Sequence, residues 1–292
     1  MAPSLIEDSW TGEDVSIASI ERELARLRDE SSEESAQPNL RTSVMTHLAW
    51  VPPDWVDKAE STLMGMAERH PSRTLIMIPR PDLEDGIDAH LSIRCFPVGD
   101  RAICGEVIEL TLRGTRAEAP ASIALPLLIS DLPVFLRWRG EPQWDSAPFE
   151  QLVDVTDRLI VDSTEWPGLP AAYGRLAALF DAVTVSDIAW TRTERWRSLL
   201  ASLWPDIGDV QSIRVRGTRA QGLLIAGWLT SRLGHRVAVE VDERERLEGI
   251  DVDGEAAPFP AGDPPNPSDV LSAELDRFSR DAIYEAAVVA AA

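Results

Sequence analysis

Short apolar runs alternate with longer amphipathic segments over residues 133–252, and this alternation limits the possible folds more than any other feature of the chain. The strand-length runs lie at 133–138, 157–162, 213–216, 236–241 and 247–252, and the helix-length segments at 169–180, 188–204 and 221–233. Parallel strands need crossover connections of a dozen or more residues, which are usually helices. The sequence therefore predicts the α/β class, with a mostly parallel sheet in this part of the chain.

The preceding part predicts an N-terminal α+β layer with a β-hairpin. Strands are expected at 41–51 and 74–78, with a helix at about 55–69 between them. Residues 90–96 and 103–112 are expected to form a hairpin. A two-residue turn at Gly99-Asp100 would pair Val98 with Arg101 and Cys95 with Cys104. It would also place Pro97 at a non-hydrogen-bonded position of the strand pair, where the N–H that proline lacks is not needed for pairing.

Both ends are expected to be acidic and helical. Residues 13–30 carry apolar side chains at helical spacing, and 31–38 have the composition of a linker. A Pro- and Gly-rich stretch at 257–268 precedes a final helix with an alanine-rich end. The predicted segments are 1–39, acidic N-terminal helix and linker; 40–118, N-terminal α+β domain; 119–256, C-terminal α/β domain; and 257–292, linker and C-terminal helix.

The net charge of -21 excludes partners that need a basic surface. Nucleic-acid binding and docking on anionic membrane both need one, so neither is expected. Residues 1–39 hold 10 acidic and 3 basic residues, and residues 238–292 hold 14 and 4. These ends are expected either to solubilise the chain or to dock on a basic partner surface.

The familiar catalytic and cofactor motifs are missing from the sequence. Lys58 is the only lysine and no glycine precedes it, so no Walker A loop is possible. No G-x-G-x-x-G or G-x-S-x-G motif occurs, and the four histidines do not have zinc-ligand spacing. No catalytic residue, cofactor or metal is therefore expected. No signal peptide or membrane-spanning run is found, which predicts a cytoplasmic protein.

The two cysteines leave two alternatives open. If Cys95 and Cys104 face each other across the hairpin, they could form a disulfide that acts as a redox switch. Alternatively, they are two small buried residues without redox chemistry.

Ten tryptophans are present, and several lie beside arginine. Trp and Arg are enriched among the residues that dominate protein–protein binding energy. We therefore expect a protein-interaction role, with some of the tryptophans in the core. The candidate partner-binding residues are Trp138, Arg139, Trp190, Arg192, Arg195 and Arg197.

Several short motifs, taken together and in order, resemble the glucose-6-phosphate dehydrogenase assembly protein family, OpcA. They are His-Pro-Ser-Arg-Thr at 70–74, Cys-Gly-Glu at 104–106, Pro-Leu-Leu-Ile-Ser-Asp-Leu-Pro at 126–133, Phe-Leu-Arg-Trp at 135–138, Asp-Arg-Leu-Ile-Val-Asp-Ser at 157–163, Asp-Ile-Ala-Trp at 187–190, Trp-Arg at 196–197 and Ala-Gly-Trp-Leu-Thr-Ser-Arg-Leu-Gly at 226–234. The resemblance covers about residues 41–252.

The resemblance implies a non-enzymatic protein that binds glucose-6-phosphate dehydrogenase as an allosteric activator or assembly factor. It also implies a role in the oxidative pentose phosphate pathway. In photosynthetic members of the family the cysteines are linked to thioredoxin control. The family's commonly doubled cysteine is here Cys104-Gly105, so one of those thiols is absent.

A second hypothesis comes from the predicted α/β layer itself. Such a layer could bind a sugar phosphate or nucleotide at a helix N-terminus. Residues 187–190 and 219–221 open plausible helices, with Arg192 and Arg219 nearby. The alternative function is therefore a small-molecule-binding module or an enzyme.

Overall fold

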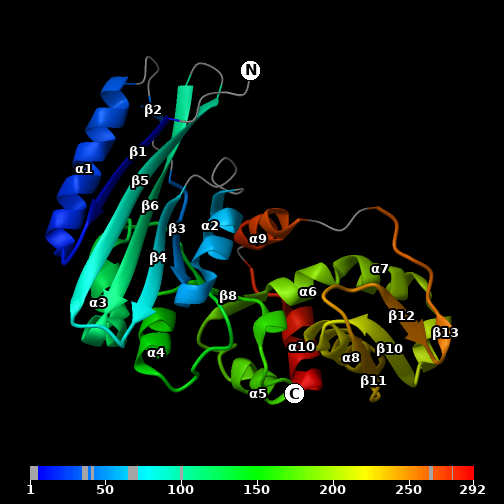
Figure 1. Cartoon of the computed structure of the whole chain (residues 1–292). Helices are drawn as coiled ribbons and strands as arrows, with labels where there is room; N and C mark the ends of the chain where they lie inside the picture. The colour runs from blue at the N-terminus through cyan, green and yellow to red at the C-terminus, as the bar shows by residue number, and fades with distance from the viewer. Residues whose placement is uncertain are drawn as a thin grey trace. The chain divides into compact units, whose positions relative to one another are not determined.

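The computed structural model describes residues 6–34, 39–40, 43–64, 72–98, 101–262, 266–277 and 279–292 (Figure 1). It confirms the predicted α/β class. The chain divides into two compact units, Met1–Leu159 and Ile160–Ala292. The predicted division into four segments stays a prediction. No helix among the described residues is long and apolar enough to cross a membrane.

Unit 1 is built on a mixed sheet with the strand order β1-β5-β6-β4-β3-β7. The strands are β1 (Ile6–Gly12), β2 (Asn39–Leu40), β3 (Thr46–Trp50), β4 (Arg73–Arg80), β5 (Gly86–Val98), β6 (Arg101–Arg113) and β7 (Val134–Trp138), and the helices are α1 (Ile17–Glu34), α2 (Val56–Met64), α3 (Pro120–Ala124) and α4 (Ala147–Asp154). β3 pairs in parallel with β4 and β7, and β4 pairs in parallel with β6. All five residues of β3 and of β7 are buried, as is typical of parallel strands.

The predicted hairpin register is confirmed. β5 and β6 pair antiparallel, with Val98 opposite Arg101 and Cys95 opposite Cys104. The turn residues 99 and 100 lie outside the described residues. The pairing extends farther than expected and ends with Gly86 opposite Arg113.

The N-terminal segment differs from the prediction because it contains a strand. β1 pairs antiparallel with β5, with Ile6 opposite Cys95 and Gly12 opposite Ala89. Helix α1 then continues through residues 31–34, where a linker was predicted, and Ser31 is buried and donates to Asp8 Oδ2 at 2.6 Å. A single edge strand is fixed by its partner strand, which the sequence alone does not identify.

A buried carboxylate attaches α1 to the sheet of unit 1. Glu106 on β6 is 8 % exposed and accepts from Arg28 Nε at 2.6 Å and from Arg73 Nε at 2.8 Å. Arg73 Nη1 also donates to the carbonyl of Leu127 at 2.7 Å. Burial by itself would raise the pKa of Glu106, but the two guanidinium groups outweigh it and hold this pKa below its usual value.

Unit 2 holds a second, smaller sheet with the order β11-β10-β12-β13. Its elements are α5 (Ala171–Ala177), β9 (Thr184–Asp187), α6 (Ile188–Arg192), α7 (Glu194–Ser202), β10 (Ser212–Gly217), α8 (Arg219–Leu233), β11 (Ala238–Glu243), β12 (Gly249–Val252), β13 (Glu255–Ala256), α9 (Pro267–Leu275) and α10 (Ala282–Ala291). β8 (Arg158–Val161) runs across the division between the units. β10 pairs in parallel with β11 and antiparallel with β12.

The long helix predicted at 188–204 is two helices, and the strand β9 before it was not predicted. The break lies at Thr193, which is buried and donates from Oγ1 to the carbonyl of Trp190 at 2.7 Å. A threonine hydroxyl that bonds to the local backbone competes with helix continuation. By contrast, α8 begins at a Thr218 capping box and ends at Gly234 in the left-handed region, where the sequence predicts its end.

The alanine-rich C-terminal end is a packed helix of unit 2. α10 (red in Figure 1) lies against α8, with Tyr284, Ala287 and Val288 buried. A Cβ at Gly227 of α8 would lie 2.2 Å from the carbonyl oxygen of Ala287. The two backbones therefore approach so closely that only glycine fits.

We expect Gly227→Ala to lower the free energy of unfolding by about 1–3 kcal/mol, because the added methyl group pushes α10 away from α8. Gly174→Ala is the matched control, since a Cβ there meets nothing within 4 Å and alanine is the better helix former. Urea unfolding would measure both. A Gly227→Ala variant as stable as Gly174→Ala would contradict the close approach.

We expect Glu106→Gln to lower the free energy of unfolding at pH 7 by about 3 kcal/mol, because the partly buried guanidinium groups of Arg28 and Arg73 lose their charged partner. The loss should shrink as the pH falls through the depressed pKa of Glu106, where wild type also loses the charge. Glu23→Gln, in an exposed pair with Arg26, is the control and should change little. A Glu106→Gln effect that is the same at pH 7 and at pH 3 would contradict this prediction.

Candidate functional site

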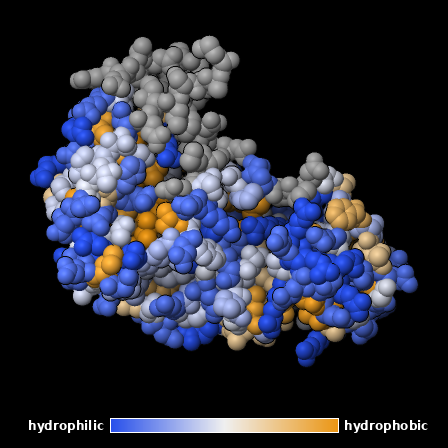
Figure 2. Space-filling view, in the orientation of Figure 1, coloured by the Kyte–Doolittle hydropathy of each residue, from blue (hydrophilic) through white to orange (hydrophobic). Residues whose placement is uncertain are grey.

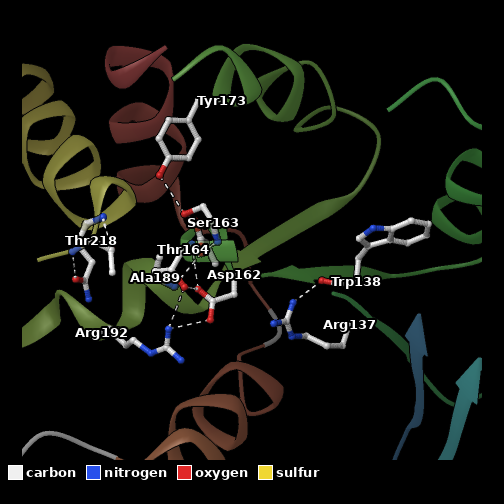
Figure 3. Close-up of polar contacts among 11 residues, drawn as sticks. Arg137, Trp138, Asp162, Ser163, Thr164, Tyr173, Ala189, Arg192 and Thr218 are labelled. Carbon is white, nitrogen blue, oxygen red and sulfur yellow. Dashed lines mark hydrogen bonds and ion pairs between the residues drawn. The ribbon is translucent and has the colours of Figure 1, made fainter. Parts of the chain in front are cut away.

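Two aspartates at strand ends are the centre of a buried polar cluster in unit 2. Figure 3 labels one of them, Asp162, together with neighbours from the cluster such as Ser163 and Tyr173. Asp162 directly follows β8, and Asp187 is the last residue of β9. β8 and β9 are neighbouring strands. Their order in the sheet therefore brings together two carboxylates that are 25 positions apart in sequence.

Asp187 is 1 % exposed and accepts hydrogen bonds from several elements. Its Oδ1 accepts from the backbone N–H of Ser163 at 3.0 Å and of Ala189 at 2.9 Å. Its Oδ2 accepts from Ser163 Oγ at 2.6 Å. The bond from Ala189 caps the N-terminus of α6, so one carboxylate fixes both this helix and the segment after β8.

Asp162 has a different set of partners. It accepts from Thr164 Oγ1 at 2.6 Å and caps the short 3-10 helix Ser163–Glu165 through the N–H of Thr164. Its Oδ2 pairs with Arg192 Nη1 at 2.8 Å. Asp162 thus has a cationic partner, whereas the groups that donate to Asp187 from Ser163 and Ala189 are neutral.

Two buried tyrosines complete the cluster. The hydroxyl of Tyr173 on α5 lies 3.0 Å from Ser163 Oγ and 3.4 Å from the carbonyl of Ala220. The hydroxyl of Tyr284 on α10 lies 3.5 Å from Asp187 Oδ2. Burial and the nearby Asp187 carboxylate raise the pKa values of both phenols well above the usual value.

Asp187 has the most perturbed carboxyl group of this cluster. Burial, followed by the charge of Asp162, raises its pKa to about 7, although the donors from Ser163 and Ala189 oppose the shift. A carboxyl group that titrates near neutral pH has the proton affinity of a general acid or base. Because Asp187 is enclosed by its own partners, it cannot reach a substrate, and the arrangement favours a role in holding the fold.

A cavity of about 690 Å³ lies beside the cluster, within unit 2. It is lined by Ser163, Thr164, Thr218, Arg219 and Arg244, together with apolar and acidic side chains. The first turn of α8 opens into it, and Arg219 is exposed there. Its size and polar lining suit a small molecule such as a sugar phosphate.

The part of the chain that the structure describes contains no cluster of potential metal ligands. No group of three or more His, Cys, Asp or Glu side chains there is placed to hold a metal ion.

The candidate partner-binding residues of unit 1 are buried. Trp138 stacks on Trp50 with ring centroids 5.2 Å apart and meets Phe149 edge-on. Arg139 is also buried and lies over the ring of Trp55 at 4.9 Å. Both residues contribute to the packing of unit 1, and their contact with a partner stays a prediction.

The four candidates of unit 2 also make internal contacts. Trp190 is buried and donates from Nε1 to Asp281 Oδ2 at 2.9 Å, and Arg197 lies 3.4 Å from the centre of its ring. Burial lowers the pKa of Arg197 to about 10. Arg192 pairs with Asp162, and Arg195 donates to the backbone carbonyls of residues 260–262. The partner contact of these residues stays a prediction as well.

Cys95 and Cys104 are joined by a disulfide, with their Cα atoms 4.1 Å apart. The structure thus shows the bonded alternative rather than two separate thiols. A redox function for this bond stays a prediction.

The sequence does not predict the buried cluster. Its members are scattered over residues 162–284 with no catalytic spacing, so only the sheet brings them together. One signal was present for Asp162, which directly follows the apolar residues 159–161 of a predicted strand. Asp187 had no such signal, because it ends β9, a strand that was not predicted.

Comparison with protein families gives two matches that follow each other along the chain. Residues 64–178 match a model described as the N-terminal domain of the glucose-6-phosphate dehydrogenase subunit. Residues 183–263 match a model described as the C-terminal domain of the same protein. Together the two matches cover more than half of the chain.

Curated relatives are cyanobacterial proteins named OxPP cycle protein OpcA. The chain is 29 % identical to that of Nostoc punctiforme over 182 residues, which is 58 % of this chain and 39 % of the relative. It is 29 % identical to that of Synechocystis sp. over 184 residues, 58 % and 38 % of the two chains. For Synechococcus elongatus the identity is 30 % over 184 residues, 58 % and 41 %. The matched region thus spans about two fifths of the length of these relatives.

We expect Asp187→Asn to gain stability relative to wild type as the pH rises. A raised pKa means that the folded state binds the proton more tightly than the unfolded state, so wild type loses stability between about pH 4 and pH 7. Asparagine does not titrate, so the difference should change in its favour by up to about 4 kcal/mol. Urea unfolding at pH 4 and pH 8 would measure it, with the exposed Asp181→Asn as control. A difference independent of pH would contradict the buried, titrating carboxyl group.

Proposed function

Because this chain belongs to the glucose-6-phosphate dehydrogenase assembly protein family, we propose that it binds glucose-6-phosphate dehydrogenase and shifts that enzyme toward a more active state. The observation that carries the proposal is the pair of family matches, in order, over residues 64–178 and 183–263. In this proposal the chain is a non-enzymatic allosteric activator and assembly factor. It acts in the cytoplasm, at the entry of the oxidative pentose phosphate pathway.

The chemistry of unit 2 supports a role without catalysis by this chain. The carboxyl group with the most suitable pKa, that of Asp187, is enclosed by donors from its own unit. The hydroxyl of Ser163 beside it is held by Asp187 and Tyr173, neither of which is the histidine that usually activates a serine nucleophile. This arrangement resembles a structural network more than an acid–base or nucleophilic centre.

Activation requires that the chain bind two states of the dehydrogenase with different affinity. Coupling of the usual size changes an apparent affinity about 5- to 150-fold. The chain can therefore act entirely through contact surfaces, without a cofactor of its own.

A second candidate function is favoured by the cavity beside α8. Its lining includes Arg219, Arg244 and three hydroxyl side chains, which suits a phosphorylated sugar or a nucleotide. Two glutamates also line it, so a ligand with hydroxyl groups beside its phosphate fits better than a bare anion.

We expect the purified chain to co-elute with the dehydrogenase from the same organism and to lower its apparent KM for glucose 6-phosphate or raise its kcat. A titration of glucose 6-phosphate with and without the chain would measure this. The chain alone, with glucose 6-phosphate and NADP⁺, is the control and should not reduce the nucleotide.

Unchanged kinetics together with no co-elution would contradict the proposed function. Calorimetric titration of the chain alone with glucose 6-phosphate distinguishes small-molecule binding in the cavity from activation of the dehydrogenase. Binding that is lost in Arg219→Ala would favour the cavity as the functional site.

A further inference from the structure

Two aromatic side chains in unit 2 are unusually exposed. Trp204 is 68 % exposed and Phe259 is 69 % exposed, the highest values for large apolar side chains among the described residues. Scattered exposed aliphatic residues are normal on protein surfaces. Two aromatic rings, each able to bury a large apolar area in a complex, are more informative.

The two rings lie at opposite ends of helix α7, Trp204 just after its last residue and Phe259 on a separate segment beside its first turn. Phe259 lies edge-on against the buried Trp196 near the start of α7, with ring centroids 5.3 Å apart. Trp204 follows the end of α7 and donates its backbone N–H to the carbonyl of Ala201 at 3.3 Å. The helix has nine residues and is therefore about 13 Å long. A standard interface covers about 800 Å² on each partner, so it can include both ends of α7.

The segment that carries Phe259 is held in place before any partner binds. Arg195 on α7 donates to the carbonyls of Pro260 at 3.0 Å, of Ala261 at 2.6 Å and of Gly262. Figure 1 shows this orange segment beside α7. Fixing a contact residue in advance reduces the entropy lost on association. Arg195 is therefore a positioning residue for Phe259.

The ring of Trp204 is supported by its own turn. A Cβ at Gly208 would lie 3.2 Å from the ring, so the ring lies close over this glycine. The ring packs on one side and is open on the other, which is the geometry of an anchor residue in a docking surface.

The surroundings of Trp204 are acidic. Asp206 and Asp209 are exposed, and the exposed Asp253 accepts from the backbone N–H of Ser212 at 2.8 Å. Residues 198–213 contain no base. His235 Nε2 lies 2.8 Å from the carbonyl oxygen of Val210, which brings the start of the following segment near this region. The next residue, Arg236, is an exposed base. Around Trp204 these three carboxylates outnumber the guanidinium of Arg236 and give this end of α7 a negative charge, whereas Arg195 and Arg197 lie toward the other end.

We propose that Trp204 and Phe259 are the anchors of a docking surface on α7, and that this surface binds a partner protein with apolar recesses flanked by Lys or Arg side chains. The inference rests on the proposed function, in which that partner is glucose-6-phosphate dehydrogenase. Aromatic anchors dominate binding energy when a partner buries them, and the acidic surroundings select a basic counterpart.

The composition of the proposed docking surface suits a reversible complex. Figure 2 shows that hydrophilic residues predominate on the face in view, and apolar ones are scattered. Permanent interfaces are broadly apolar, whereas reversible ones combine a few apolar anchors with polar surroundings. Trp204 and Phe259 are such apolar anchors, and the carboxylates near Trp204 supply the polar surroundings of a reversible interface.

The test measures the affinity of the full chain for the dehydrogenase by biolayer interferometry. We expect Trp204→Ala with Phe259→Ala to weaken binding about 30-fold or more, the affinity change that corresponds to loss of a hot spot. Asp206→Lys with Asp209→Lys should slow association and reduce its salt dependence. Val289→Ala, also exposed on unit 2, and Leu83→Ala, on unit 1, are the controls and should bind within about 2-fold of wild type.

Circular dichroism and the melting temperature confirm that each variant is folded, which we expect because both rings are mostly exposed. A folded double variant that binds as tightly as wild type would overturn the docking surface while leaving the proposed function intact. Wild type that does not bind the dehydrogenase at all would overturn the proposed function and this inference with it.

Discussion

Unit 2 depends on the burial of one carboxyl group, that of Asp187. Removing a carboxylate from water is costly unless hydrogen bonds replace the water, and here they come from several elements. Ser163 after β8 and Ala189 of α6 donate directly, Tyr284 of α10 lies within reach, and Tyr173 of α5 connects through Ser163. The elements must therefore assemble around this group together. A buried network of this kind specifies the arrangement more than it adds net stability.

Features set by local spacing could be predicted from the sequence. The hairpin register follows from a two-residue turn and the tolerance of Pro97 at a non-bonded position, and the end of α8 follows from Gly234. Strand β1 and the break at Thr193 could not be predicted, because each depends on a partner distant in sequence or on a side-chain hydrogen bond. The same holds for the Asp187 cluster, whose members share no spacing.

The sequence alone could not show whether a tryptophan next to an arginine belongs to the core or to a binding surface. Trp138 and Trp196, each flanked by two arginines, are core residues. The neighbouring Arg139 lies over the ring of Trp55, and Arg197 lies over the ring of Trp190. Trp204, which has no arginine next to it, is the exposed one. An Arg-Trp-Arg pattern therefore indicates a guanidinium packed on an indole as readily as a binding surface, and only burial separates the two.

The negative charge is carried largely by folded elements. In unit 1 the acidic α1 is tied to the sheet through Glu106, Arg28 and Arg73, and in unit 2 the residues after 238 form strands and helices. The exposed carboxylates around Trp204 give the proposed dehydrogenase contact its preference for a basic counterpart. Hydrogen–deuterium exchange of the full chain with and without the dehydrogenase tests this account most directly. It predicts that binding slows exchange of backbone amides in residues 199–211 and 257–262. Unchanged exchange in both segments, with a complex formed, would contradict it.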